Sequence, residues 1–257
     1  YYSLSKITGD AKPRALHAAI FTLEKMCAGG IYDHVGGGFS RYSVDSYWMI
    51  PHFEKMLYDN GPLLALYAQS FALTNSSQFK DVCEGTANWV IREMQSPEGG
   101  YYSTLDADSE GVEGKYYVWT RNQVENILND EEYAIFAPHY GLDQTTNFDG
   151  SYHLHTFVSK TEVREQCSLT EEEFVKLLNQ AKQKLFAIRE QRIHPKRDEK
   201  ILSSWNALMI RGMAITGRIL NSHEYIQSAE YALKFLRQTM WKNERLFATF
   251  KDGKAHL

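Results

Sequence analysis

The sequence predicts an all-α-dominated fold, an (α/α) toroid in which helical hairpins form a ring and short antiparallel β-hairpins occupy the loops. A unit of helix, turn, helix and glycine-led extended segment occurs twice in the 257 residues. Apolar residues within the helices recur at intervals of three and four. Long polar loops precede equivalent helices of the two copies, and a closed ring would focus such loops on one cavity. A straight solenoid is the structural alternative.

The repeat becomes visible when residue 79 is aligned with residue 225, and the match needs no gap over more than forty residues. The aligned pairs include, in order, Asn60 with Asn206, Leu64 with Ile210, Phe79 with Tyr225, Trp89 with Phe235, Met94 with Met240, and Tyr101 with Phe247. Helix, turn, helix and extended segment match in one register, which indicates a repeated structural unit.

Local signals place the individual elements. Helices are expected over residues 13–26, 62–74, 78–95, 169–189, 207–220 and 224–241, and extended segments over 101–104, 115–119 and 246–250. Pro13 is tolerated in a first helical turn, and Thr170 caps a turn rich in glutamate. No stretch has the composition of a linker, so residues 1–257 are expected to form a single, partial domain.

Composition and charge exclude several classes of function. The net charge is -4 without a basic stripe, which argues against nucleic-acid binding. No apolar run approaches the roughly 18 residues of a membrane span, and no signal peptide is visible. Cys27, Cys83 and Cys167 are scattered, which favours reduced thiols in the cytoplasm and provides no CxxC pair. We expect no cofactor and no resident metal.

Two segments near the start of the chain combine turn-forming and titratable residues. Residues 29–45 hold five glycines within ten positions together with Asp33, His34 and Arg41, which indicates backbone bending beside a ligand. Tight turns between two strands are the structural alternative. Residues 52–59 hold five titratable groups, and a carboxylate beside a histidine suits general acid–base catalysis. A solvated helix start is the alternative there.

Two later segments add carboxylates. Asp106 and Asp108 are two positions apart and can share a ligand hydroxyl, a cation or a proton, although the spacing of an EF-hand is absent. An acidic surface turn is the alternative. In the repeat, His52 falls on Asp198, and both positions precede the same kind of helix. Equivalent loops of a ring face one end, so we expect the two polar segments to converge on one mouth.

Several long motifs occur in order along nearly the whole chain. They are Gly-Gly-Ile-Tyr-Asp-His-Val-Gly-Gly-Gly-Phe from Gly29, His-Phe-Glu-Lys-Met-Leu-Tyr-Asp-Asn from His52, Asp-Ala-Asp-Ser from Asp106, Lys-Tyr-Tyr-Val-Trp from Lys115, and Leu-Ser-Ser-Trp-Asn-Ala-Leu-Met from Leu202. This pattern resembles the spermatogenesis-associated protein 20 family and its bacterial relatives.

The resemblance implies an N-terminal thioredoxin-like domain followed by an (α/α)6 barrel of the six-hairpin glycosidase type, similar to N-acylglucosamine 2-epimerase. This chain would be part of that barrel, so the ring would be incomplete. The resemblance also implies a sugar-like ligand. The acid–base candidates are His34, His52, Glu54, Asp106, Asp108 and Asp198, and the ligand-contacting candidates are Arg41, Trp48, Tyr58, Asp59, Trp205 and Asn206.

Four functions stay open at this point. A sugar epimerase or isomerase needs an acid and a base on opposite ring faces, for which His34 and His52 are candidates. A glycoside hydrolase needs two carboxyl groups about 5 to 9.5 Å apart. The alternatives are a non-catalytic ligand- or protein-binding domain that partners the thioredoxin-like domain, and a metal-dependent site at Asp106 and Asp108.

Overall fold

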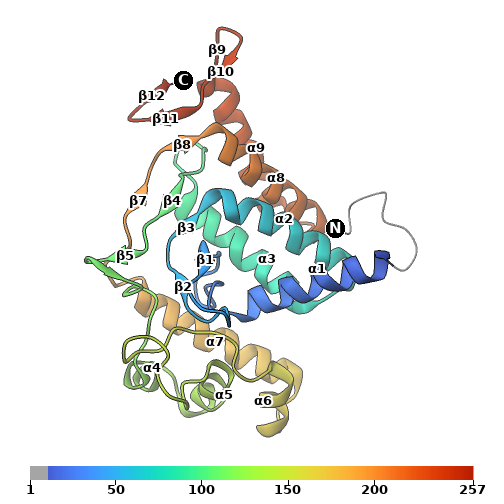
Figure 1. Ribbon diagram of the computed structural model, residues 1–257, viewed down its shortest axis with the longest axis vertical. Helices are drawn as coiled ribbons and strands as arrows, with labels where there is room; N and C mark the ends of the chain where they lie inside the picture. Colours follow the sequence, from blue (N-terminus) through green and yellow to red (C-terminus); the bar gives the residue numbers. More distant parts are fainter. Residues whose placement is uncertain (1–10, 257) are drawn as a thin grey trace.

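The computed structural model describes residues 11–256, in which helices predominate (Figure 1). The helices are α1 (Ala11–Ala28), α2 (Leu57–Thr74), α3 (Ser77–Trp89), α4 (Arg121–Ile127), α5 (Asp130–Tyr140), α6 (Lys160–Gln166), α7 (Glu171–Arg189), α8 (Ser203–Leu220) and α9 (His223–Phe235). Single π-helical turns, η1 (Val90–Met94) and η2 (Leu236–Met240), extend α3 and α9.

Short antiparallel strands occupy the loops, as the sequence predicts. They are β1 (Tyr42–Ser43), β2 (Pro51–His52), β3 (Lys55–Met56), β4 (Thr104–Leu105), β5 (Asp108–Ser109), β6 (Val112–Glu113), β7 (Arg197–Asp198), β8 (Ile201–Leu202), β9 (Trp241–Lys242), β10 (Arg245–Leu246), β11 (Thr249–Lys251) and β12 (Lys254–His256). Within residues 11–256, no helix is both long enough and apolar enough to cross a bilayer.

The predicted repeat is present in three dimensions. Inner helices α2 and α8 pack along each other, and outer helices α3 and α9 cover them (Figure 1). Glycines allow the close approach of the inner helices, because a Cβ at Gly212 would lie 2.5 Å from the carbonyl oxygen of Gly61. The described residues hold two such pairs, fewer than the six hairpins that the resemblance implies for a complete ring.

The ungapped alignment is wrong at its end. The amide of Tyr102 donates to the carbonyl of Met94, and the amide of Phe247 donates to the carbonyl of Met240. Tyr102, not Tyr101, is therefore the counterpart of Phe247. The turn after the outer helix is one residue shorter in the second copy, and a turn absorbs such a deletion without disturbing either helix.

A buried asparagine performs the same task in each copy. Asn60 accepts a hydrogen bond from the amide of Phe39 (2.7 Å) and donates to its carbonyl (2.9 Å). Asn206 makes the same pair of bonds with Tyr101, at 2.7 and 2.9 Å. Each side chain also donates to the carbonyl four residues earlier. These amides attach the preceding extended segment to the start of the inner helix.

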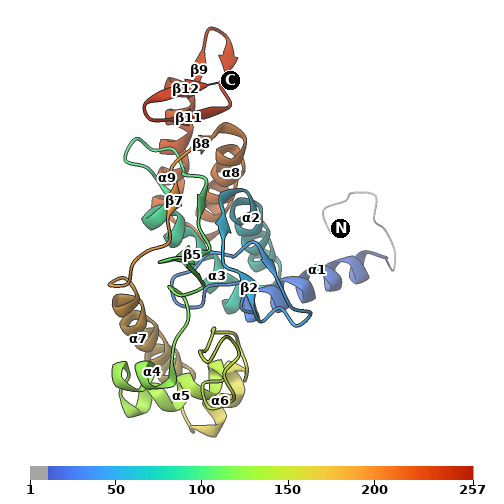
Figure 2. The same cartoon turned by 60° about the vertical axis from the view of Figure 1, so that its left-hand side comes forward.

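The largest difference between the copies is an insertion. Sheet β3–β4–β7 corresponds to sheet β8–β11–β12. The turn Asp252–Gly253 joins the last two strands of the second sheet, whereas residues 106–196 separate β4 from β7 in the first. These residues form the inserted unit, which includes α4 to α7 and lies at the lower end of the molecule (Figures 1 and 2).

The inserted unit is where the sequence prediction succeeds least. Helix α7 agrees with the expected range, and Thr170 caps it as predicted. Helices α4, α5 and α6 were not predicted, because two of them have only seven residues and α5 contains Pro138. Residues 115–119, expected to be extended, form turns, and only Trp119 makes a β-bridge, to Tyr152.

Two main apolar clusters stabilise these parts. The first lies among α1, α2, α3 and α8 and includes the fully buried Tyr67, Trp89 and Met213. The second belongs to the inserted unit and includes Phe136 and Phe174. Each large side chain buried in this way contributes about 1.5–3 kcal/mol of transfer free energy, so both the repeat and the insertion have a core of their own.

Candidate functional site

The loops that precede the two inner helices lie at the same end of the molecule. Strand β4 pairs with β3 on one side and with β7 on the other (Figure 1). Thr104 is in register with both Met56 and Asp198. Strands lie about 4.8 Å apart, so the Cα atoms of Met56 and Asp198 are separated by roughly 10 Å. The β4 strand is what joins these two distant parts of the sequence.

Glu54 lies at the centre of a chain of polar contacts at this end. Arg41 Nη1 donates to Glu54 Oε2 over 3.3 Å, and His52 Nε2 lies 3.7 Å from the same oxygen. On its other side, His52 Nδ1 lies 2.7 Å from Glu113 Oε1. The ring of Tyr42 stacks on His52 at 5.1 Å between centroids. This chain of contacts couples two carboxylates through one imidazole.

Glu113 was not among the candidates from the sequence. It lies in β6, and the β5–β6 hairpin of the inserted unit brings it to His52 across 61 positions of sequence. The sequence signal for Glu113 was its place in the acidic segment that begins at Asp106. Residue spacing alone does not show that this carboxylate contacts His52. A carboxylate bonded to one imidazole nitrogen fixes the tautomer and directs the other nitrogen.

Asp59 adds a carboxyl group with unusual surroundings. It lies in the first turn of α2, and its Oδ2 is buried without a hydrogen-bond partner among residues 11–256. Burial raises its pKa to about 6, an effect that nearby Arg41 opposes and Glu54 reinforces. Asp59, Arg41 and Tyr58 line a hollow of about 270 Å³ with apolar neighbours. Tyr58 packs edge-to-face on Trp205, at 4.7 Å.

The remaining carboxylate candidates are outside this chain of contacts. Asp198 pairs with Lys200 at 3.0 Å. Burial would raise the pKa of Asp198, but the hydrogen bonds and charge of Lys200 lower it. Asp106 and Asp108 are exposed, and Asp106 accepts from the amide of Asp108 at 3.3 Å. Among residues 11–256, no group of three or more His, Cys, Asp and Glu side chains is placed to hold a metal ion.

Three other candidates also lie apart from Glu54. His34 is buried, bonds to the carbonyl of Gly29 at 2.9 Å and lines a different hollow. Trp48 has a left-handed backbone (φ 60°) and lines an open hollow of about 520 Å³ beside α1. Asn206 is fully buried and bonded to backbone groups, which leaves none of its donors for a ligand. Asn206 has the structural role described above, and its role as a ligand contact stays a prediction.

A buried ionic cluster was also missed from the sequence. Arg189 donates to both oxygens of Asp33 at 2.8 and 2.9 Å, and Lys55 Nζ donates to Asp33 Oδ2 at 2.8 Å. Burial alone would raise the pKa of Asp33, but the two cations hold it well below its usual range. Lys55 directly follows Glu54, and successive side chains of an extended segment point to opposite faces. The buried bonds of Lys55 therefore anchor the segment that presents Glu54.

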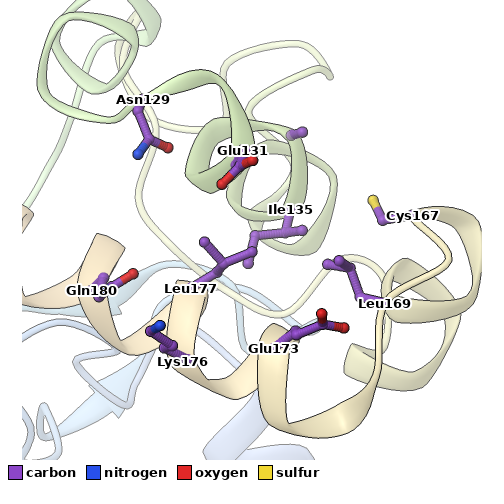
Figure 3. Close-up of a pocket in the computed structure, with 10 residues that line it drawn as sticks. Asn129, Glu131, Ile135, Cys167, Leu169, Glu173, Lys176, Leu177 and Gln180 are labelled. Carbon is purple, nitrogen blue, oxygen red and sulfur yellow. The ribbon is translucent and has the colours of Figure 1, made fainter.

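A further hollow of about 470 Å³ lies within the inserted unit, between α5 and α7 (Figure 3). Ile135 and Leu177 face each other across it, and Glu173 and Lys176 are at its rim. The Glu173 carboxylate already accepts from the amide of Thr170 in the α7 cap. None of the residues that the sequence singles out for chemistry lines this hollow.

The paired inner and outer helices define a protein of the (α/α)-toroid class, with a polar cluster at the start of its inner helices. No model of a known protein family matches the chain. It is 36% identical to human spermatogenesis-associated protein 20 over 98% of its length, and 38% identical to the mouse protein over 94%. The chain belongs to the spermatogenesis-associated protein 20 family. It spans 36% and 34% of these two relatives, about a third of each.

Solved structures show only weak likeness. A family 76 glycoside hydrolase from a bovine Bacteroides thetaiotaomicron strain is 14% identical, with a TM-score of 0.35 over 89% of this chain and 42% of that one. A sugar epimerase from a ruminal bacterium is 12% identical, with a TM-score of 0.33 over 99% and 78%.

Proposed function

We propose that this domain binds a sugar-like polyhydroxyl compound beside the start of α2 and acts on it by general acid–base catalysis. The observation that supports this most is the Oδ2 of Asp59, which is buried without a hydrogen-bond partner among residues 11–256. It lies next to the contacts of Arg41, Glu54, His52 and Glu113. A buried acceptor without a partner is costly, and a ligand hydroxyl would satisfy it.

Asp59 and His52 are the proposed proton-transfer groups. A pKa of about 6 places Asp59 near neutrality, where a group both accepts and releases protons efficiently. Glu113 orients His52, and Arg41 holds Glu54 beside it. In an epimerase or isomerase, Asp59 and His52 would move the substrate proton. In a glycoside hydrolase, Asp59 and Glu54 would be the two carboxyl groups.

The surroundings suit a polyhydroxyl ligand. Tyr58 and Trp205 form an aromatic pair next to the hollow, and sugars bind through aromatic faces combined with a few directed polar groups. Arg41 lines the same hollow and offers donors for ring hydroxyls. Asp106, Asp108 and Asp198 are placed outside this proposal because their contacts are made elsewhere.

The test uses the full-length protein. Its thermal unfolding is followed with mono- and disaccharides, and turnover is then measured on any sugar that raises Tm. Asp59→Asn and Glu113→Gln are expected to lower kcat by about 100-fold, the size of a general acid–base contribution. Asp130→Asn is the matched control for Asp59→Asn, because Asp130 also lies in the first turn of a helix. Glu172→Gln makes the same substitution as Glu113→Gln at an exposed position away from the cluster.

Failure of every sugar to raise Tm, or unchanged kcat in both cluster variants, would refute the catalytic proposal. The domain would then be better described as a non-catalytic ligand- or protein-binding partner of the thioredoxin-like domain. We propose that this thioredoxin-like domain lies in the two thirds of the relatives that the chain does not span. We also propose a cytosolic location, in keeping with three free cysteines.

A further inference from the structure

A second polar hollow, of about 310 Å³, lies where the inserted unit meets the repeat. The glycine-rich loop after α1 and helix α3 contribute one side of it. Helices α5 and α7 of the inserted unit contribute the other. Its volume is at the small end of the range for ligand pockets, which suits a monosaccharide-sized compound.

Two buried histidines that line this hollow each keep one nitrogen that can accept a hydrogen bond. His34 Nε2 lies 2.9 Å from the carbonyl of Gly29, and His139 Nδ1 lies 2.7 Å from the carbonyl of Val158. Because a carbonyl only accepts, these nitrogens carry the protons, and His34 Nδ1 and His139 Nε2 are bare. Burial lowers both pKa values, that of His139 to about 4, so both rings are neutral at pH 7.

Two buried tyrosines provide donors beside these acceptors. The rings of His34 and His139 flank Tyr140, with centroids 5.2 and 4.5 Å away. The side chains of Tyr140 and Tyr32 both line the hollow. All four side chains are more than nine-tenths buried. Donors and acceptors on neighbouring side chains match hydroxyl groups, each of which donates and accepts.

A cation completes the lining. Lys182 on α7 has no carboxylate within 4.0 Å among residues 11–256, whereas the neighbouring Lys160 pairs with Asp81 at 2.9 Å. The Lys182 ammonium lies 6.0 Å from the Tyr140 ring centroid. Burial lowers the pKa of Lys182. The carboxylates of Asp81 and Glu84 also line the hollow, and Asp81 acts on Lys182 from beyond contact distance. An anionic group on the ligand would give the Lys182 ammonium a counter-charge in direct contact.

Glycines keep the floor of the hollow in place. A Cβ at Gly85, inside α3, would lie 2.3 Å from the hydroxyl of Tyr32. Gly37 has a left-handed backbone (φ 81°), and a Cβ there would lie 2.1 Å from the carbonyl oxygen of Gly85. Glycine weakens a helix interior, so its presence at position 85 is explained by the space that Tyr32 needs.

We propose that this hollow is a second ligand site, which binds a monosaccharide-sized polyhydroxyl compound with one anionic group, either a sugar acid or a sugar phosphate. The site is separate from the Asp59 hollow and does not depend on the proposed catalysis. It takes side chains from both the repeat and the inserted unit, so its ligand would connect the two.

Isothermal titration calorimetry on the full-length protein tests the site with four probes: glucuronate, glucose 6-phosphate, glucose and inorganic phosphate. At least one of the two anionic sugars is expected to bind more tightly than glucose or phosphate. Lys182→Met should weaken that binding by about tenfold or more, as expected for loss of a hydrogen bond to a charged group. Tyr32→Phe, which removes one hydroxyl and keeps the ring, should weaken it several-fold.

Matched variants separate this site from its surroundings. Lys176→Met makes the same substitution on α7 at an exposed position of another hollow and should bind as the wild type does. Titration of Asp59→Asn removes the contribution of the proposed sugar site beside α2. The anionic sugar should still bind to this variant, so failure of the catalytic proposal is distinguishable. The inference is overturned if neither anionic sugar binds, if glucose or phosphate alone binds as tightly as they do, or if Lys182→Met and Tyr32→Phe bind like the wild type.

Discussion

Replacing Asn206 with alanine tests whether this residue has a structural role or contacts a ligand. Its side chain is fully buried and makes three hydrogen bonds to backbone groups, two with Tyr101 and one with the carbonyl of Leu202 at 3.0 Å. Each bond contributes about 1 kcal/mol net, and the backbone groups left behind have no water to replace it. We expect Asn206→Ala to lower the free energy of unfolding by about 3 kcal/mol.

Urea denaturation of the full-length protein, followed by circular dichroism, measures this loss. Asn60→Ala removes the equivalent bonds in the first copy and should cost a similar amount. Asn122→Ala, at an exposed position of α4, is the control and should change stability by less than about 0.5 kcal/mol. If Asn206→Ala unfolds at the wild-type urea concentration but loses sugar binding, the structural explanation is wrong and Asn206 is a ligand contact.

Three further predictions concern charge and backbone. Asp33→Ala should destabilise the protein by about 3–5 kcal/mol, because it leaves two buried cations without their counter-ion; urea unfolding measures the change. Gly37→Ala should cost more than about 2 kcal/mol in the same assay, because its Cβ would meet backbone, whereas Gly111→Ala, with nothing within 4 Å, should cost only about 1 kcal/mol of left-handed strain. Asp59→Asn should raise Tm relative to wild type at pH 7 and not at pH 4. Asp59 has a pKa of about 6 in the folded protein, above the ordinary 3.8 of the unfolded chain. Its protonated carboxyl therefore stabilises the fold fully below pH 3.8, and this stabilisation is lost as the pH rises through about 6.

Each of these has an outcome that contradicts it. A loss below about 1 kcal/mol in Asp33→Ala would mean that the buried cluster adds nothing to stability. Equal costs for Gly37→Ala and Gly111→Ala would show that the close approach to α3 is not needed. A Tm difference for Asp59→Asn that is constant between pH 4 and pH 7 would show that Asp59 titrates like an exposed carboxyl.

Most of the repeat was predictable because its signals are local. Apolar residues at helical spacing gave the inner and outer helices, although α2 begins at Leu57, before the expected position 62. The turn length after α3 was not predictable from an ungapped match. Helices α4 to α6 were missed because short helices are held by packing against neighbours more than by their own pattern.

Part of the candidate site was predictable in the same way. His52, Glu54, Tyr58 and Asp59 lie within eight positions, so a strand followed by a helix start keeps them close. Arg41 reaches Glu54 through the β1–β2 hairpin. Sequence proximity also misled: His34 is near Arg41 along the chain, yet the glycine-rich loop turns it toward α5 and α7.

By itself, the sequence determined the family, the helical repeat and the polar segment before the first inner helix, because each depends on residues that are close together in the sequence. Only the tertiary structure decided which charges meet. Glu113 reaches His52, and Arg189 reaches Asp33 from 156 positions away, because an insertion folds back against the repeat. Such contacts depend on how distant elements pack together. A contact between two residues so far apart in the sequence produces no periodic pattern from which it could be predicted.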